Sequence, residues 1–238
     1  MEQFIYHNLF ETKGIEYIIT IIFFVLLVPF WMTLNRKNTL EEQAQTAFET
    51  IKAGLLRIPQ GLFYCPNHLW SHLEKSGHAK AGIDDFLQHA LGEIQIRHLI
   101  DPGSGVEKGQ PLFEIRQNEK LLTLTAPISG TVEGINPELQ KNYRIINSDP
   151  YGTGWVYKIR PENWKEEIDS CHFAEDATDW MENELSRFKG FISASVDKYM
   201  PGAGEAAYLD KGELIDHTLT SMPSEIWNSF HRDFLDMG

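Results

Sequence analysis

The feature that most constrains this chain is an uncharged apolar run near its N-terminus. Residues Tyr17 to Leu34 read YIITIIFFVLLVPFWMTL and contain no Asp, Glu, Lys or Arg. A run of this kind can span the hydrocarbon core of a bilayer only as a helix, because hydrocarbon offers the backbone no other hydrogen-bond partners. Tyr17 and Trp31 lie near its two ends, where aromatic residues anchor at membrane interfaces. The run predicts one transmembrane helix over residues 17–34.

A cleaved signal peptide is the alternative interpretation of this run. Signal peptides begin with basic residues, but the first 16 residues here contain three Glu and one Lys. No small-x-small cleavage site follows the run, so a retained anchor is favoured. Arg36 and Lys37 come directly after it, and the positive-inside bias therefore predicts a cytoplasmic soluble domain. Residues 1–16 become an extracytoplasmic tail of a single-pass protein in the inner or plasma membrane.

Charge and cysteine content restrict the partners and the compartment. The net charge is −13, which argues against nucleic acid as a partner because phosphate binding requires a basic stripe. The acidic residues are spread along the chain and indicate a solubilising surface. The only cysteines are Cys65 and Cys171, too few for a disulfide framework. This cysteine usage favours a reducing compartment.

Residues 35–57 are expected to form a helical spacer between the membrane and the rest of the chain. Thr39 can cap a helix, and Glu42 follows three residues later, as in a capping box. Good helix formers then continue up to Gly54, where the helix is expected to end.

From residue 58 the pattern changes to short strands punctuated by Gly and Pro. Segments rich in β-branched and aromatic residues that alternate with turn residues are typical of an antiparallel sheet. One helix is expected early in this region, near Asp84 to Leu91. The segments expected to be strands are QIRHLI (95–100), PLFEIR (111–116), LLTLTA (121–126), GTVEGI (130–135) and GWVYKI (154–159).

The last 70 residues are expected to be mainly helical. Residues 169–200 form a predicted helical extension, because apolar side chains recur at helical spacing from Thr178 onward. Residues 201–238 form a predicted flexible linker and a short amphipathic helix capped by Ser224. The apolar stripe of that helix can dock in a groove of a partner protein or pack on its own domain, and both readings stay open. The stripe consists of Ile226, Trp227, Phe230 and Phe234.

Five motifs follow one another in a fixed order between residues 68 and 155. They are HLW (68–70), GIDDFLQHALGEI (82–94), VEKG (106–109), APISG (126–130) and NSDPYGTGW (147–155). In this order they resemble the H protein of the glycine cleavage system, over about residues 63–168. The resemblance implies a mainly β fold of the barrel-sandwich hybrid (lipoyl-domain-like) type with peripheral helices over residues 58–168, to which the single N-terminal transmembrane helix is added.

The resemblance also implies a carrier lysine at the tip of a β-hairpin. In the family, lipoic acid is joined to that lysine by an amide and carries an aminomethyl group between partner enzymes. The family lysine stands ten residues after the position of Gly109 and seven before that of Ala126. Both counts point to Glu119 in this chain.

Lys120, the next residue, is the candidate for lipoyl attachment. A shift of one residue turns a side chain to the opposite face of a strand, so Lys120 is displaced from the family geometry. Arg116 stands where the family has an acidic residue three positions before the lysine. We therefore expect no cofactor, and a lipoylated Lys120 is the alternative.

The cysteines and histidines are the candidate metal ligands of the chain. Cys65, His68, Cys171 and His172 have the right chemistry for four zinc ligands, but adjacent ligands suit a tetrahedral site poorly. A buried thiol at Cys65 and a surface pair at Cys171 and His172 are favoured, and His89 is expected on a helix surface. The chain has no nucleophile elbow, P-loop or Gly-x-Gly-x-x-Gly motif, so no catalytic residue is assigned and the chain is not expected to be an enzyme.

Three functions remain as hypotheses. The favoured one is a membrane-anchored H-protein-like module without a working arm, acting as a non-catalytic adapter or scaffold. The second is a carrier lipoylated at Lys120 that shuttles an aminomethyl group or reducing equivalents. The third is a zinc-stabilised binding module. The expected partners are the lipid bilayer and proteins of a glycine-cleavage-like or membrane redox assembly.

Overall fold

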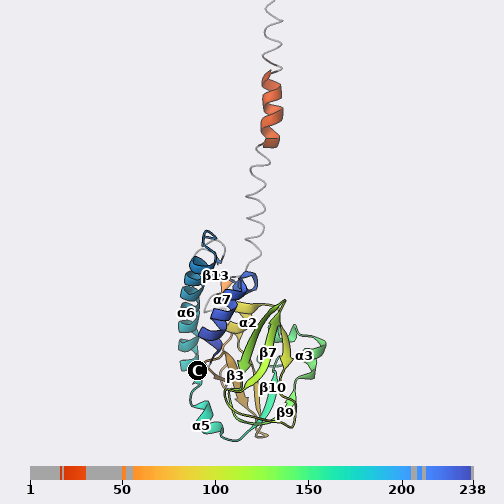
Figure 1. Cartoon of the computed structure of the whole chain (residues 1–238), viewed down its shortest axis with the longest axis vertical. Helices are drawn as coiled ribbons and strands as arrows, with labels where there is room; N and C mark the ends of the chain where they lie inside the picture. The colour runs from red at the N-terminus through yellow and green to blue at the C-terminus, as the bar shows by residue number, and fades with distance from the viewer. Residues whose placement is uncertain are drawn as a thin grey trace, which may run out of the picture. The chain divides into compact units, whose positions relative to one another are not determined.

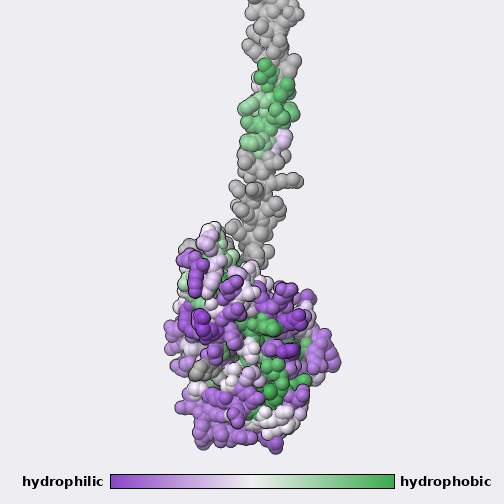
Figure 2. Space-filling view, in the orientation of Figure 1, coloured by the Kyte–Doolittle hydropathy of each residue, from purple (hydrophilic) through white to green (hydrophobic). Residues whose placement is uncertain are grey.

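The computed structural model describes residues 17, 19–30, 50, 51, 56–204, 208–210 and 213–236. The chain divides into two compact units, residues 1–48 and 49–238, and each is considered by itself. In the first unit, residues 19–30 are helical and carry exposed apolar side chains (Figure 2, green). No helix among the described residues is long and apolar enough to cross a membrane. The predicted tail, residues 18 and 31–34 of the predicted span, and most of the predicted spacer lie outside the described residues.

Among the described residues the second unit has three antiparallel sheets. Two of them form its β-domain (Figure 1). Within the described residues, the larger sheet has seven strands in the order β11-β2-β3-β4-β10-β9-β6, and the smaller has the order β5-β7-β8. This confirms a sheet-rich domain with peripheral helices. The strands of the larger sheet are β2 (Phe63–Tyr64), β3 (Leu69–Leu73), β4 (Ala79–Ile83), β6 (Gly105–Val106), β9 (Gly130–Ile135), β10 (Tyr157–Pro161) and β11 (His172–Phe173), and those of the smaller are β5 (Gln95–His98), β7 (Pro111–Gln117) and β8 (Lys120–Thr125).

Helices surround the sheets (Figure 1). Helix α2 begins where predicted, because the Asp84 side chain accepts a hydrogen bond of 2.8 Å from the backbone N–H of Leu87 and so caps its first turn. The helices are α2 (Asp85–Leu91), α3 (Pro137–Lys141), α4 (Ile145–Ser148), α5 (Trp164–Ile168), α6 (Glu175–Tyr199) and α7 (Ser224–Phe230), with a 3₁₀ helix η3 (Thr218–Ser221) and a π-helix η4 (His231–Leu235).

The core of the domain is tightly packed around large side chains. Trp70 is 1% exposed, and its indole N–H donates a 3.1 Å hydrogen bond to the carbonyl of Pro150. A Cβ at Gly82 on the neighbouring strand would lie only 2.9 Å from this indole ring. Glycine at position 82 therefore leaves the space that the Trp70 ring fills. Both residues belong to the motifs that resemble the H protein.

The C-terminal part of the chain packs on its own domain. Helix α6 buries one face, including Leu185, Phe188 and Ile192. The apolar stripe of the last helix is also buried, with Trp227 at 1% and Phe234 at 3% exposure. The structure therefore answers the open question about this stripe in favour of intramolecular packing. The helix starts at Ser224 with Pro223 in the N-cap position and without a side-chain cap, so the predicted Ser224 cap is wrong.

The last part of the predicted helical spacer forms a strand instead. Residues Thr50–Ile51 (β1) pair with β13 (Glu213–Ile215), which also pairs with β12 (Leu209–Asp210). Local sequence favoured a helix here, but the partner strand lies more than 160 residues away and gives no local signal. We call the described residues 208–210 and 213–236 the C-terminal segment.

The two cysteines form a disulfide, which corrects the prediction of a buried thiol and a surface pair. Strand β11 pairs with β2 in the register His172 to Tyr64, so the next pair along the same register is Cys171 and Cys65. Their Cα atoms are 4.2 Å apart and their sulfur atoms are bonded. The bond joins positions 106 residues apart, a proximity that only the strand pairing reveals.

Candidate functional site

The β7–β8 hairpin ends in a two-residue turn. Gln117 pairs with Lys120, which leaves Asn118 and Glu119 as the loop. Asn118 has φ = 55°, a left-handed conformation that Asn tolerates and that suits tight hairpin turns. Glu119 is exposed in this turn, where the resemblance places the carrier lysine. The tip of the hairpin thus presents a carboxylate.

Lys120 is bound by the C-terminal segment. Its Nζ donates hydrogen bonds of 3.0 Å to the carbonyl of Thr220 and 2.5 Å to that of Met222. The same ammonium lies 4.9 Å from the centre of the Trp227 ring, within range of a cation–π interaction. Burial lowers the pKa of Lys120. Lys120, the predicted attachment candidate, is therefore half-buried and joins the hairpin to the C-terminal segment of the same chain.

Gln117, on the other side of the turn, connects the hairpin to α2 and η3. Its side-chain amide donates hydrogen bonds of 2.6 Å to the carbonyl of Leu91 and 2.9 Å to that of Glu93. The Thr220 hydroxyl donates a 2.8 Å hydrogen bond to the same Leu91 carbonyl. The end of α2, the hairpin and η3 therefore share one set of polar contacts.

The open edge of β8 is also covered. The Nε2 of His231 donates a 2.8 Å hydrogen bond to the carbonyl of Thr123, and the Asn67 amide donates a 2.9 Å hydrogen bond to that of Thr125. Edge carbonyls left unpaired would be open to pairing with another chain. The C-terminal segment covers the middle of this edge through His231, and Asn67 covers its end.

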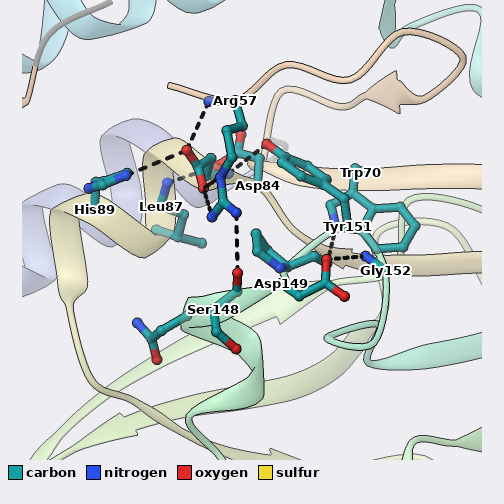
Figure 3. A network of polar contacts seen from close by, with 12 residues as sticks. Arg57, Trp70, Asp84, Leu87, His89, Ser148, Asp149, Tyr151 and Gly152 are labelled. Atoms are coloured by element: carbon teal, nitrogen blue, oxygen red, sulfur yellow. Dashed lines mark hydrogen bonds and ion pairs between the residues drawn. The ribbon is translucent and has the colours of Figure 1, made fainter. Parts of the chain in front are cut away.

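Charged and polar side chains gather around α2, among them Arg57 and His89 (Figure 3). Asp216 attaches the C-terminal segment to the same helix. His89 lies 2.9 Å from Asp216 and 3.5 Å from Asp85, and Arg57 pairs with Asp85 at 2.7 Å. Burial alone would lower the pKa of His89, but hydrogen bonds and charges from Asp216 and Asp85 raise it to about 9. The predicted surface role of His89 is wrong, because a residue 127 positions away completes its environment.

A buried histidine joins the β-domain to α6. His68 is fully buried, with Nδ1 2.8 Å from Asp84 and Nε2 3.6 Å from Glu184. Burial would lower the pKa of His68, but the charge of Asp84 and the contacts with Glu184 raise it to about 9. The ring stacks on Phe86 with centroids 4.4 Å apart. The two carboxylates therefore favour the charged form of this buried histidine, which lies between Phe86 of α2 and Glu184 of α6.

The zinc alternative does not fit these contacts. Cys65 and Cys171 are bonded to each other, so neither offers a thiolate, and His68 faces Asp84. His172 lies 2.6 Å from Asp176, one turn along the chain. Across the described part of the chain there is no group of three or more His, Cys, Asp or Glu side chains that could hold a metal ion.

Sequence reasoning located the hairpin but missed what binds it. The contacts to Lys120 come from two backbone carbonyls and one indole face, and backbone carbonyls carry no sequence signal. The available hint was the apolar stripe around Trp227, which had to pack somewhere. Only the fold shows that this stripe packs against the hairpin.

Comparisons with known proteins agree with the geometry. The family model described as glycine cleavage H-protein matches residues 62–184. A probable glycine cleavage system H protein of Pyrococcus abyssi is 34% identical over 133 residues, covering 56% of this chain and 98% of that protein. The corresponding protein of a Psychrobacter species is 37% identical over 106 residues, covering 44% of this chain and 84% of its own length.

A solved structure is also similar in part. The crystal structure of a glycine cleavage system H protein from Mycobacterium marinum has 28% sequence identity and a TM-score of 0.41, covering 44% of this chain and 86% of that one. The matched family region ends within α6, so the C-terminal segment lies outside it. Since the family model covers half of the sequence and the Pyrococcus relative is matched over nearly its whole length, the chain belongs to the glycine cleavage H-protein family.

Proposed function

We propose that this chain is an H-protein-like module without a working lipoyl arm, which acts as a non-catalytic adapter or scaffold. One observation carries the proposal: the hairpin tip holds Glu119, and the adjacent amine of Lys120 is bound by the chain's own C-terminal segment. An arm joined by an amide requires a free lysine amine. A carboxylate at the tip cannot form that bond.

The contacts of the C-terminal segment support a fixed hairpin. The segment pairs with β1, forms the ion pair between Asp216 and His89 on α2, and binds Lys120 on the hairpin. The segment is thus attached to two other elements as well as to the hairpin, which supports a hairpin held in one orientation. A fixed orientation suits a binding module, whereas a carrier depends on an arm that moves.

The membrane anchor belongs to the same proposal. The apolar run of residues 17–34 supports attachment to a bilayer, with glycine-cleavage-like or membrane redox proteins as partners. Two observations favour opposite sides of the membrane. Arg36 and Lys37 favour a cytoplasmic domain, whereas the Cys65–Cys171 bond is typical of oxidising compartments.

The side of the membrane on which the domain lies can be decided by alkylation of its cysteines. Intact cells are quenched with acid, which traps the thiols in their cellular redox state, and free thiols are then alkylated. A cytoplasmic domain predicts alkylation of both cysteines, because the cytoplasm keeps thiols reduced. Protection of both cysteines until a reductant is added would contradict the cytoplasmic orientation. A variant with both cysteines replaced by Ser serves as the unlabelled control.

Restoring the family lysine tests the absence of an arm. The variant Glu119→Lys, produced in a host that lipoylates its own carrier proteins, is expected to gain a lipoyl group at position 119. The unchanged chain produced in the same host is expected to gain none. Lipoylation of the unchanged chain that disappears in Lys120→Ala but persists in Lys75→Ala would contradict the proposal.

A carrier lipoylated at Lys120 is the second candidate. Family membership favours it, and Lys120 is the first residue after the turn. This function requires Lys120 to leave its contacts with Thr220, Met222 and Trp227. It therefore predicts a chain in which the C-terminal segment moves away from the hairpin.

A further inference from the structure

The surroundings of Lys120 have the chemistry of a receptor for a primary ammonium. Two of its N–H donors point at the carbonyls of Thr220 and Met222, and its charge lies over the face of Trp227. An ammonium has three N–H donors and a positive charge. The two carbonyls accept hydrogen bonds from two of the donors, and the indole ring faces the charge. We name Thr220, Met222 and Trp227 the amine clamp.

An acylated lysine cannot satisfy the amine clamp. Its amide nitrogen has a single N–H and no charge, so one carbonyl loses its donor and the cation–π contact is lost. The acyl group also needs space where the half-buried amine now meets η3 and α7. Acylation of Lys120 and closure of the clamp are therefore mutually exclusive.

We propose that the amine clamp masks Lys120, so that an activated acyl donor can modify this residue only after the C-terminal segment has moved off the hairpin. In that step the free amine attacks the acyl carbon and the new C–N bond forms. The bond between the acyl carbon and its leaving group breaks, the leaving group takes the electron pair, and the nitrogen releases a proton. This inference deepens the proposed function, since it gives the reason why the hairpin amine carries no arm.

Several contacts keep the clamp in place. The Trp227 indole N–H donates a 2.6 Å hydrogen bond to the carbonyl of Leu219, which holds the ring over Lys120. On either side of the clamp, Asp216 binds His89 and His231 binds the backbone of β8. Opening the clamp thus requires several contacts to break together, which makes the open state a minor one.

Acetylation of the full chain with an N-hydroxysulfosuccinimide ester, followed by peptide mass spectrometry, tests the mask. Lys75 and Lys165 are exposed and serve as internal references for the reagent. We expect Lys120 to react about tenfold or more slowly than these lysines. The test is stringent, because the lowered pKa of Lys120 would speed its reaction if the amine were accessible.

Matched variants separate the clamp from general loosening. Lys108 is another held amine, bound to the Glu167 carbonyl at 2.6 Å and the Ser170 hydroxyl at 2.8 Å, next to α5. Trp227→Leu should speed acetylation of Lys120 and leave that of Lys108 unchanged. Trp164→Leu, which changes α5, should leave that of Lys120 unchanged.

A second measurement tests whether the ammonium of Lys120 keeps the C-terminal segment on the hairpin. Lys120→Gln removes the charge as an acyl group does, and Lys120→Arg keeps it. Hydrogen exchange of peptides from residues 218–230 should be faster in the Gln variant than in the Arg variant, by about tenfold at the most protected amides. Equal exchange in both variants would mean that the charge of Lys120 does not hold the clamp.

The outcomes distinguish this inference from the proposed function. If Lys120 reacts within about twofold of Lys75 in the unchanged chain, the clamp is wrong, and the armless adapter is unaffected. If the native protein carries lipoate on Lys120, the armless adapter is wrong. Slow acetylation of Lys120 in molecules that carry no lipoate would then still support its masking by the amine clamp.

Discussion

Two kinds of chemistry attach the C-terminal helices to the β-domain. At the α6 end, a disulfide joins Cys171 to Cys65 next to the β2–β11 pair. At the hairpin end, ion pairs and hydrogen bonds hold the segment through Asp216 and Lys120. A covalent bond is insensitive to pH and breaks under reduction, whereas the polar contacts depend on charge. The covalent and the polar attachments, which include the His68–Glu184 contact at α6, can therefore be loosened separately.

Breaking the disulfide should have the largest effect. Cys65→Ser is expected to lower the free energy of unfolding by about 4 kcal/mol, because the bond closes a loop of more than 100 residues in the unfolded chain. Denaturant unfolding measures the change. Cys171→Ser and the double variant should behave alike, and a reductant should destabilise the unchanged chain only. Unequal effects of the two single variants would contradict this explanation.

Raising the pH should loosen the polar attachments. The pKa values of His68 and His89 are both raised to about 9, so the folded chain retains protons that the unfolded chain releases near pH 6.5. The stability from these protons is fully present below pH 6.5 and is lost as the pH rises through 9. We expect a loss of roughly 2–4 kcal/mol, measured as unfolding free energy across this range. A flat profile would contradict the charged state of both histidines.

Removing the carboxylate of Asp216 should show how much of the pH-dependent stability comes from His89. Asp216→Asn leaves His89 with Asp85 as its remaining acidic partner and is expected to cost about 1–2 kcal/mol at pH 6. The cost should shrink at pH 9, where the histidine is neutral in more of the molecules. Asp236→Asn, an exposed change in the same segment, is the matched control and should be close to neutral.

The smallest effect is expected at the hairpin itself. Lys120→Ala loses two hydrogen bonds and one cation–π contact on a half-buried side chain, for a cost of about 1 kcal/mol. Lys75→Ala, on an exposed turn, should change stability by less than about 0.5 kcal/mol. Equal effects of the two variants would mean that the clamp contributes no stability.

The parts of the fold governed by local pattern could be predicted. Short apolar segments bounded by Gly and Pro located β7 and β8, and a helix was expected near Asp84 to Leu91, where α2 lies. The counts from Gly109 and Ala126 placed Glu119 at the hairpin tip, where the structure has it. These features depend on neighbours within a few residues of one another, which a single sequence displays.

The parts governed by distant contacts could not be predicted. Strands β3 and β4 contain His72, Lys80 and Gly82, which hide the strand pattern. The disulfide depends on a strand pair whose two members are short and far apart. The clamp depends on backbone carbonyls, which every residue has. In each case the missing information is a contact between segments that sequence spacing does not record.

The intact mass of the native protein tests the central claim most directly, because it reports whether the Lys120 amine is free in cells. The claim predicts a chain without an added lipoyl group, and a tryptic peptide containing an unmodified Lys120. A lipoyl group on Lys120 in the native protein would contradict it.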